Sequence, residues 1–419
     1  MNVLFCCPPR RGHATRNIAI AAELSSRGHY IEFVSYEEAR QWIPDSIRFV
    51  SAGPTPEEHE SLYFTMYKDF TWRSNYEYIQ QSFKNPSDFV GENWQHYITN
   101  LLVAAAKRIR SQEHSWDLIV LDDHWCNLGK ALADEQGIPT AFVASFCLGT
   151  KVDLVIRPLL ALRLYLTSSL SLARVFKLKK TSQKQIKKRL GITHDNTDQA
   201  IEPIYLIPTV PEVIKGVRIP SSSHCIGSMI SPEIGMEKDD NLEAWMQKGP
   251  FIYINFGTLV YSEAEIKICI EAFRHCPWRA LIVNFSMDFS TVTHVSENIL
   301  VLKYVPQQQV LQHANIKLFI SHGGPNSFHE SLYFGIPMLS IPFLGDQYYF
   351  AESVQKKGFG LMMERHTLTG KRILHAVDKI SKDQHILSRC QSMAKILRKE
   401  DSLDRAAQVL ESVKPEAVS

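Results

Sequence analysis

The sequence lacks the features that mark several classes of protein. Its eight cysteines in 419 residues form no CxxC pair, no zinc-ligand spacing and no dense disulfide framework, so we expect reduced and mostly buried thiols. It has no uninterrupted apolar run of about 18 residues, which predicts no membrane-spanning helix. Its first residues show no basic-then-apolar signal pattern. Together these absences favour a cytoplasmic protein without a structural metal.

An excess of charge of one sign is also missing. Lys and Arg total 46 against 44 Asp and Glu, a formal charge of +2, which is too balanced for a surface that grips nucleic acid. Residues 173–190 are locally basic, with eight basic residues and no acidic one, and they follow the apolar stretch Leu154–Leu172. We interpret this segment as a solvated helix face. Peripheral contact of residues 154–190 with anionic lipid is the alternative.

The hydrophobic pattern predicts two α/β domains. Short apolar runs alternate with helical segments in both halves of the chain, and the expected strands are 3–7, 31–34, 117–121, 140–144, 251–256, 280–284, 299–302, 317–320 and 338–341. Such alternation is typical of a doubly wound parallel sheet. We expect the first domain at 1–215, the second at 216–395, and a helix within 396–419 that packs back on the first.

The loop Ser321–Ser327, with the sequence SHGGPNS, is the densest candidate for ligand binding. It links an expected strand to an expected helix whose first residue is Pro325. Free N–H groups and the helix dipole at such a position attract anions, and His322, Asn326 and Ser327 add side-chain donors. The loop therefore predicts a diphosphate site, with a simple glycine-rich turn as the alternative. Walker A, GxGxxG and GxSxG signatures are absent, so ATP, NAD and serine-hydrolase chemistry are not indicated.

Acidic and amide side chains follow this loop. Glu330 lies three residues after Ser327 on the same helical face, where a carboxylate can accept hydrogen bonds from a ribose diol. A surface Glu favoured by the helix dipole is the alternative. Asp346 and Gln347 open another helix and suit a polyhydroxylated sugar, although Asp346 is also a good capping residue.

These motifs have a combined spacing that resembles a known family. The matching residues run from Tyr304-Val305-Pro306-Gln307 through His313-Ala314, Ser321–Ser327, Glu330, Gly335-Ile336-Pro337, Pro342 and Asp346-Gln347 to Gly358-Phe359-Gly360. This stretch resembles UDP-dependent glycosyltransferases of the GT-B fold and the family-1 type, which include plant natural-product and bacterial macrolide enzymes. The resemblance implies two Rossmann-like α/β domains that face a central cleft, residues 1–215 binding the acceptor and residues 216–395 the UDP-sugar.

The resemblance also implies roles for individual residues. Tyr304 would stack on uracil, Gln307 would lie near the ribose, and Glu330 would hold the ribose hydroxyls. The diphosphate would contact Thr258, His322, Gly324, Asn326 and Ser327, and the sugar would contact Asp346 and Gln347. Three positions depart from the family pattern: Tyr304 replaces a frequent Trp, Pro325 a Trp or Met, and Phe350 an Asn. The sugar therefore stays open, with UDP-glucose expected as co-substrate and no metal or cofactor.

A second pair of candidate residues lies in the N-terminal half. His13 is expected on the loop 8–13 after the first strand, and Asp122 directly follows the strand 117–121. An imidazole is suited to accept a proton near pH 7, and a carboxylate can orient it. An ordinary loop histidine and a turn residue are the alternatives, and Asp123 is an alternative partner. The family's catalytic His and Asp fall at His13 and Asp122.

The expected reaction is an inverting transfer of a hexose from a UDP-sugar to a hydroxyl of an apolar small molecule, with His13 as general base. Aromatic residues between 63 and 97 would line an acceptor pocket or pack in the core. The first alternative is a lipid glycosyltransferase at the membrane surface. The second is a non-catalytic GT-B partner protein, which the joint presence of His13, Asp122, Glu330, Asp346 and Gln347 disfavours.

Overall fold

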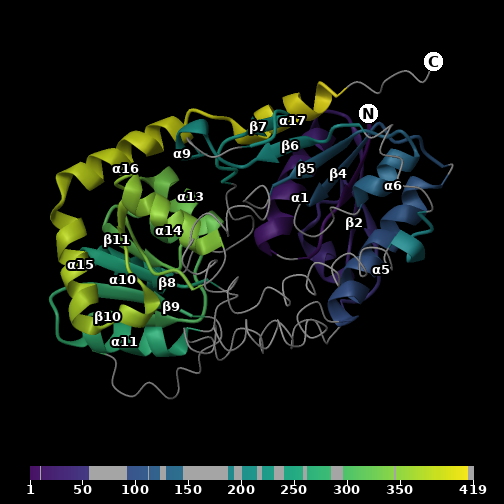
Figure 1. Cartoon of the computed structure of the whole chain (residues 1–419). Helices are drawn as coiled ribbons and strands as arrows, with labels where there is room; N and C mark the ends of the chain where they lie inside the picture. Colours follow the sequence, from purple (N-terminus) through teal and green to yellow (C-terminus); the bar gives the residue numbers. More distant parts are fainter. Residues whose placement is uncertain are drawn as a thin grey trace, which may run out of the picture. The chain divides into compact units, whose positions relative to one another are not determined.

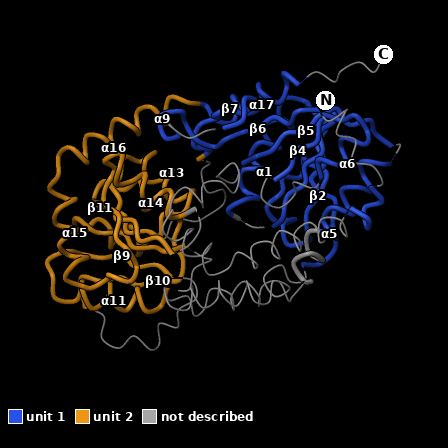
Figure 2. Tube along the Cα trace, in the orientation of Figure 1, with its two compact units in different colours: residues 1–62, 76–229, 401–419 blue, residues 63–75, 230–400 orange. Residues whose placement is uncertain are grey.

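The computed structural model divides the chain into two compact units (Figure 2). It describes residues 1–9, 11–55, 92–111, 113–122, 129–144, 187–192, 201–214, 219–230, 240–257, 262–284, 296–343 and 346–413. Unit 1 comprises Met1–Leu62, Tyr76–Met229 and Asp401–Ser419, and unit 2 comprises Tyr63–Asn75 and Ile230–Glu400. The change of unit after Met229 comes later than the expected boundary near 215, because strand β7 (Ser223–Cys225) still pairs with β6 (Ile204–Ile207).

Unit 1 is built on a seven-stranded parallel sheet in the order β3-β2-β1-β4-β5-β6-β7. Its other elements, in chain order, are β1 (Asn2–Cys6), α1 (Arg11–Ser26), β2 (Tyr30–Ser35), η1 (Glu37–Trp42), β3 (Arg48–Ser51), α5 (Glu92–Ile109), β4 (Leu118–Asp122), α6 (Gly129–Glu135), β5 (Thr140–Val143), α9 (Pro211–Ile214) and α17 (Ser402–Glu411). The central strands β1 and β4 are apolar and buried, as expected for a sheet covered on both faces. Figure 1 shows helices around this sheet.

Unit 2 contains a six-stranded parallel sheet in the order β10-β9-β8-β11-β12-β13. Its elements are α10 (Asp240–Gln247), β8 (Phe251–Asn255), α11 (Glu263–Arg274), β9 (Arg279–Val283), β10 (Ile299–Leu302), α12 (Gln307–Leu311), β11 (Ile316–Ser321), α13 (Pro325–Phe334), β12 (Met338–Ser340), α14 (Asp346–Lys356), β13 (Gly360–Met362), η3 (Arg365–Thr367), α15 (Gly370–Lys382) and α16 (Gln384–Leu397). The predicted α/β class is confirmed in both units.

The last helix, α17, completes the core of unit 1 although 171 residues of unit 2, from Ile230 to Glu400, precede it in the chain. Its apolar side chains Ala406, Ala407 and Leu410 are fully buried in the same cluster as β1 and α1. At the rim, the Arg27 guanidinium donates to Asp404 Oδ1 at 2.5 Å and to Glu411 Oε2 at 3.3 Å. Burial and ion pairing thus tie the chain's end to its first helix.

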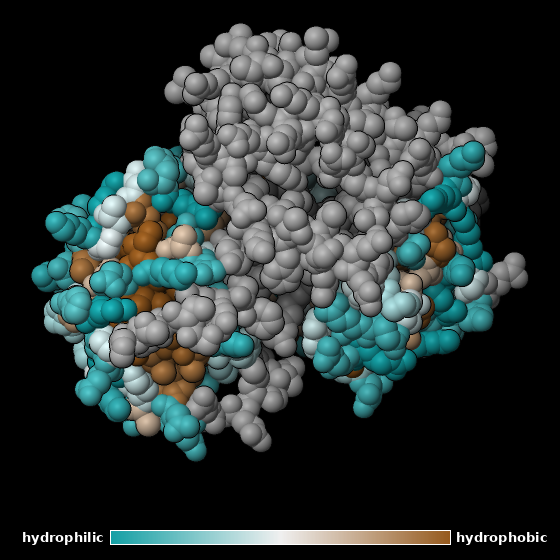
Figure 3. Space-filling model, turned by 90° about the horizontal axis from the view of Figure 1, so that it is seen from below, coloured by the Kyte–Doolittle hydropathy of each residue, from teal (hydrophilic) through white to brown (hydrophobic). Residues whose placement is uncertain are grey.

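On the face seen in Figure 3, the described residues are mostly hydrophilic, and apolar side chains gather on unit 2. Among the described residues, Tyr304 is the large hydrophobic side chain that stands out as exposed, at 39%. In the part of the chain that the structure describes, no helix has the length and apolar character needed to cross a membrane.

Candidate functional site

In both sheets the order in which successive strands are added reverses at a central pair of strands. In unit 1 the strand order reverses between β1 and β4, and in unit 2 between β8 and β11. Ligands of open α/β sheets bind beyond the carboxyl ends of the strands at such switch points. The predicted residues follow these strands: His13 comes after β1, Asp122 ends β4, and the loop Ser321–Ser327 starts at the end of β11.

His13 and Asp122 form a hydrogen-bonded pair in unit 1. His13 Nδ1 lies 2.8 Å from Asp122 Oδ2, and the side chains are 20% and 1% exposed. The expectation that His13 lies on a loop is wrong, since α1 already begins at Arg11 and His13 occupies its first turn. A carboxylate accepts hydrogen bonds, so Nδ1 carries the proton and Nε2 keeps a lone pair. Asp123 lies outside the described residues.

Cys7 is fully buried and lies close enough to Asp122 for the charge of that carboxylate to act on its thiol. Burial raises the pKa of the Cys7 thiol well above its ordinary value, and the charge of Asp122 raises it further. Cys7 is therefore a neutral thiol at pH 7.

The loop after β11 forms the amino end of helix α13. Gly324 is the N-cap residue and Pro325 the first helical residue, as predicted, while Gly335 ends the helix in a left-handed conformation with φ of +75°. Gly323 also has a positive φ, +76°, which a residue with a side chain rarely adopts. The first-turn N–H groups of α13 have no carbonyl partner within the helix, which makes this end suited to an anion.

His322 stands in a slot between two glycines. A Cβ atom on Gly257 would lie 2.8 Å from His322 Cε1, and one on Gly324 would lie 2.9 Å from the same atom and closer still to Nε2. Burial lowers the pKa of His322 to about 4, so the ring is neutral at pH 7. Ser321 Oγ accepts from Gly323 N–H and lies 3.4 Å from His322 Nδ1. The hydroxyl hydrogen can thus go to Nδ1, which leaves Nε2–H as the donor.

A hydrogen-bond network centred on Gln307 joins the predicted ribose and phosphate residues. Gln307 Nε2 donates to Glu330 Oε2 and, at 3.3 Å, to Ser327 Oγ. Gln307 Oε1 accepts from Tyr253 OH at 3.3 Å and from Asn255 Nδ2 at 3.0 Å. The structure therefore brings Gln307, Ser327 and Glu330 together, through the start of α12 and the first half of α13.

Two members of this network, Tyr253 and Asn255, were not among the predicted site residues, and neither was Gln308, whose amide donates to Glu330 Oε1 at 3.3 Å. Tyr253 is fully buried on β8, where the sequence pattern indicates only core packing. The one available signal was the polar Asn255 at the end of an apolar strand that points into the switch-point crevice.

The predicted sugar residues lie at the amino end of α14, close to the phosphate loop. A Cβ on Gly323 would lie 3.2 Å from the Gln347 carbonyl oxygen, so the two loops touch. Gln347 is 6% exposed, and its Oε1 accepts from the Phe343 N–H at 2.9 Å, which leaves its NH₂ group as donor. Asp346 begins α14, but its side chain is outside what the structure describes, as is Thr258.

Phe350 and Tyr304, two departures from the family pattern, have different environments. Phe350 is fully buried, with its ring centroid 4.9 Å from that of Phe328, and therefore belongs to the packing between α13 and α14. Tyr304 is exposed and lies three residues before the start of α12, which suits a flat platform for a base. The described residues contain no group of three or more His, Cys, Asp or Glu side chains able to hold a metal ion.

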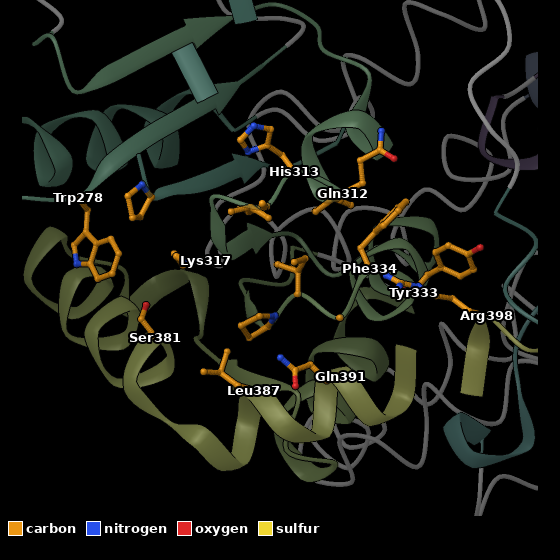
Figure 4. Close-up of a pocket in the computed structure, with 17 residues that line it drawn as sticks. Trp278, Gln312, His313, Lys317, Tyr333, Phe334, Ser381, Leu387, Gln391 and Arg398 are labelled. Carbon is orange, nitrogen blue, oxygen red and sulfur yellow. Dashed lines mark hydrogen bonds between the residues drawn. The ribbon is translucent and has the colours of Figure 1, made fainter. Parts of the chain in front are cut away.

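A cavity of about 910 Å³ lies at the other end of the unit 2 sheet, where the amino ends of the strands are (Figure 4). Pro250, Trp278, Ile316 and Pro337, which line it, precede or begin the strands β8, β9, β11 and β12. The candidate donor residues follow the carboxyl ends of these strands and do not line the cavity. The cavity is thus separate from the loop site.

The sequence and the fold are similar to those of known glycosyltransferases. Residues 232–413 match the model of the family described as UDP-glucoronosyl and UDP-glucosyl transferase. The NDP-glycosyltransferase YjiC of Bacillus subtilis is 32% identical over 186 residues, 44% of this chain and 47% of that protein. The matched segment thus spans about half of that relative. YjiC of Bacillus licheniformis is 24% identical over 96% of this chain and 95% of its own length.

Among solved structures, the glycotransferase of kitacinnamycin has the same fold, with a TM-score of 0.74, 19% identity and coverage of 99% of both chains. The fold is therefore that of the GT-B glycosyltransferases to which the chain is similar. Within that fold, residues 232–413, somewhat less than half of the chain, are similar to the UDP-dependent glycosyltransferases of the matched family.

Proposed function

We propose that the protein transfers a sugar from a UDP-sugar to a hydroxyl group of an apolar acceptor, with inversion at the anomeric carbon. The observation that carries the proposal is the 2.8 Å contact between His13 Nδ1 and Asp122 Oδ2. This contact leaves His13 Nε2 as a base, and the ring is 20% exposed, so a substrate can reach it. Asp122 is the orienting partner that stabilises the imidazolium formed during transfer.

In the proposed step, the acceptor oxygen attacks the anomeric carbon while its proton passes to His13 Nε2. A bond from that oxygen to the anomeric carbon forms as the bond from the carbon to the diphosphate oxygen breaks. UDP leaves with the bonding electron pair. The amino end of α13 and the neutral His322 Nε2–H are suited to stabilise the charge that develops on the diphosphate.

For donor binding, we propose that uracil stacks on Tyr304 and that Glu330 accepts from the ribose hydroxyls. His322, Gly324, Asn326 and Ser327, with Thr258, would hold the diphosphate, and Asp346 and Gln347 the sugar, with UDP-glucose as the first donor to test. Exposure of Tyr304 and the network around Glu330 support these roles. The acceptor remains defined only as a hydroxyl on an apolar molecule, since most of the aromatic segment 63–97 and of the segment 154–190 lies outside the described residues.

The proposal is tested by measuring UDP release with a panel of UDP-sugars and apolar acceptors, and by determining the anomeric configuration of the product by NMR. His13→Ala should lower the rate constant by about 10²–10⁴-fold, the usual contribution of a general base, while UDP affinity stays at the wild-type value. Equal loss of transfer and UDP binding would indicate a folding defect. Transfer by His13→Ala at the wild-type rate, or retention of the anomeric configuration in the product, would refute the mechanism.

A further inference from the structure

The Gln307 side chain is held by groups on both of its ends. Its oxygen faces two donors from β8, Tyr253 OH at 3.3 Å and Asn255 Nδ2 at 3.0 Å. Its nitrogen faces two acceptors on α13, Ser327 Oγ and a carboxylate oxygen of Glu330. If the Gln307 amide were rotated by 180°, its oxygen would face the Glu330 carboxylate and its nitrogen would face Asn255 Nδ2. One orientation of Gln307 is therefore selected.

The donors on β8 are themselves fixed. Tyr253 is fully buried, and its ring stacks on Phe319 of β11 with centroids 4.8 Å apart. Asn255 Oδ1 accepts from the Gly257 N–H at 2.8 Å, so the Asn255 nitrogen must point the other way, toward Tyr253 OH and Gln307 Oε1. The strand thus imposes the direction of every hydrogen bond up to Gln307.

Glu330 is the last acceptor in this series of hydrogen bonds. One carboxylate oxygen accepts from Gln307 Nε2 and the other from Gln308 Nε2. Each oxygen of a carboxylate can accept more than one hydrogen bond, so the two amide donors do not by themselves prevent Glu330 from accepting from the hydroxyls of a ligand. Two amide donors fix the plane of the carboxylate before any ligand arrives, which reduces the entropy lost on binding.

We infer that Tyr253 and Asn255 are positioning residues that orient Glu330 through Gln307, and that this arrangement makes the protein select ribonucleotide over 2′-deoxyribonucleotide donors. The inference rests on the proposed function, in which Glu330 accepts from the ribose hydroxyls. A carboxylate held in one plane can accept hydrogen bonds from both ribose hydroxyls at once. A ligand that lacks the 2′-hydroxyl loses one of these bonds and should therefore bind with lower affinity.

The test compares the affinities of UDP and 2′-deoxy-UDP by isothermal titration calorimetry. The two ligands share the base and the diphosphate, so general damage to the site lowers both affinities alike and leaves their ratio unchanged. We expect the wild-type protein to prefer UDP by about tenfold or more, the usual effect of a hydrogen bond to a charged group.

Asn255→Asp should bring this ratio close to one, because an acceptor at position 255 turns Gln307 round and presents its oxygen to Glu330. Tyr253→Phe keeps the stacked ring, removes one donor and should lower the ratio less. Should Asn255→Asp fail to fold, Tyr253→Phe still decides the matter. Ile254→Val is the matched control, since this buried residue lies on the same strand but on its other face, and its ratio should equal that of the wild type.

Wild-type ratios in both Tyr253→Phe and Asn255→Asp would overturn the inference while leaving the proposed function intact. A wild-type protein that binds UDP without discriminating against the deoxy ligand would also overturn it. A wild-type protein that binds neither nucleotide would instead refute the proposed function, and the role of Tyr253 and Asn255 would fall with it.

Discussion

Gly324→Ala tests whether the slot around His322 is needed for diphosphate binding. The φ of Gly324 is −64°, a value open to any residue, so the substitution strains no backbone. The new methyl group would lie 2.9 Å from His322 Cε1 and closer to Nε2. A Cβ built on Gly257 would also lie 2.8 Å from this ring, so the Gly257 backbone is close by, and we expect the imidazole to rotate out of the slot rather than to shift sideways.

The expected magnitude follows from the single donor that is lost. A hydrogen bond to a charged group contributes about 1.5–3 kcal/mol, and about 1.4 kcal/mol is a factor of ten in affinity. UDP affinity should therefore fall by about tenfold to about 100-fold. Uridine, which has no phosphates, should bind Gly324→Ala as it binds the wild type. Calorimetric titration with both ligands measures the two effects.

A double-mutant cycle with His322→Ala isolates the mechanism. If the methyl group acts by displacing the ring, it should cost nothing further once the ring is gone, so Gly324→Ala/His322→Ala should match His322→Ala alone. Additive losses would show that the methyl group blocks the diphosphate itself. Unchanged UDP affinity in Gly324→Ala would refute the assignment of His322 to the diphosphate.

Three further predictions concern stability. The pKa of His322 is lowered to about 4 from an ordinary 6.5, so the unfolded chain binds this proton more readily than the folded protein does. The free energy of unfolding should therefore fall by up to about 3 kcal/mol as the pH drops from about 6.5 to about 4. Urea titrations at several pH values measure this loss, and His322→Gln should remove it. Arg108→Ala leaves the fully buried Glu32 without its two-point partner and should cost about 3 kcal/mol of unfolding free energy, whereas Lys356→Ala, in an exposed pair, should stay within about 0.5 kcal/mol. Leu410→Ala should lower the stability of unit 1 by about 2–5 kcal/mol, seen as a shift of one calorimetric transition; an unshifted transition would contradict the packing of α17.

The strands could be predicted because each is a short apolar run buried in a parallel sheet. Phe251–Asn255 and Leu118–Asp122 are of this kind, and their ends placed the loops correctly. Strand β13 could not be found this way, since Gly360–Met362 has only three residues and begins with glycine. The start of α1 was missed because Arg11, Gly12 and His13 contribute nothing to an apolar face, although they already have helical backbone.

The candidate site was predicted where a residue's chemistry and its neighbours in sequence were enough. His322 lies within a glycine-rich strand-to-helix turn and Glu330 follows that turn, which local sequence reveals. Tyr253 and Asn255 act on Gln307, which is 52 residues away from Asn255 in the chain, and only the folded sheet brings them within hydrogen-bond reach. Phe350 differs from these residues: it stands at a position of the motif that indicates a ligand contact, but in the fold it packs against Phe328.

The place of α17 has a consequence for synthesis on the ribosome. Translation proceeds from the amino end, yet the cluster around β1 and α1 lacks Ala406, Ala407 and Leu410 until the last residues emerge. The long stretch Ile230–Glu400 leaves the exit tunnel earlier and carries its own sheet. Unit 1, whose first segment is made before unit 2, is therefore completed after it, and a nascent chain that stalls before residue 400 exposes an incomplete apolar surface to chaperones and proteases.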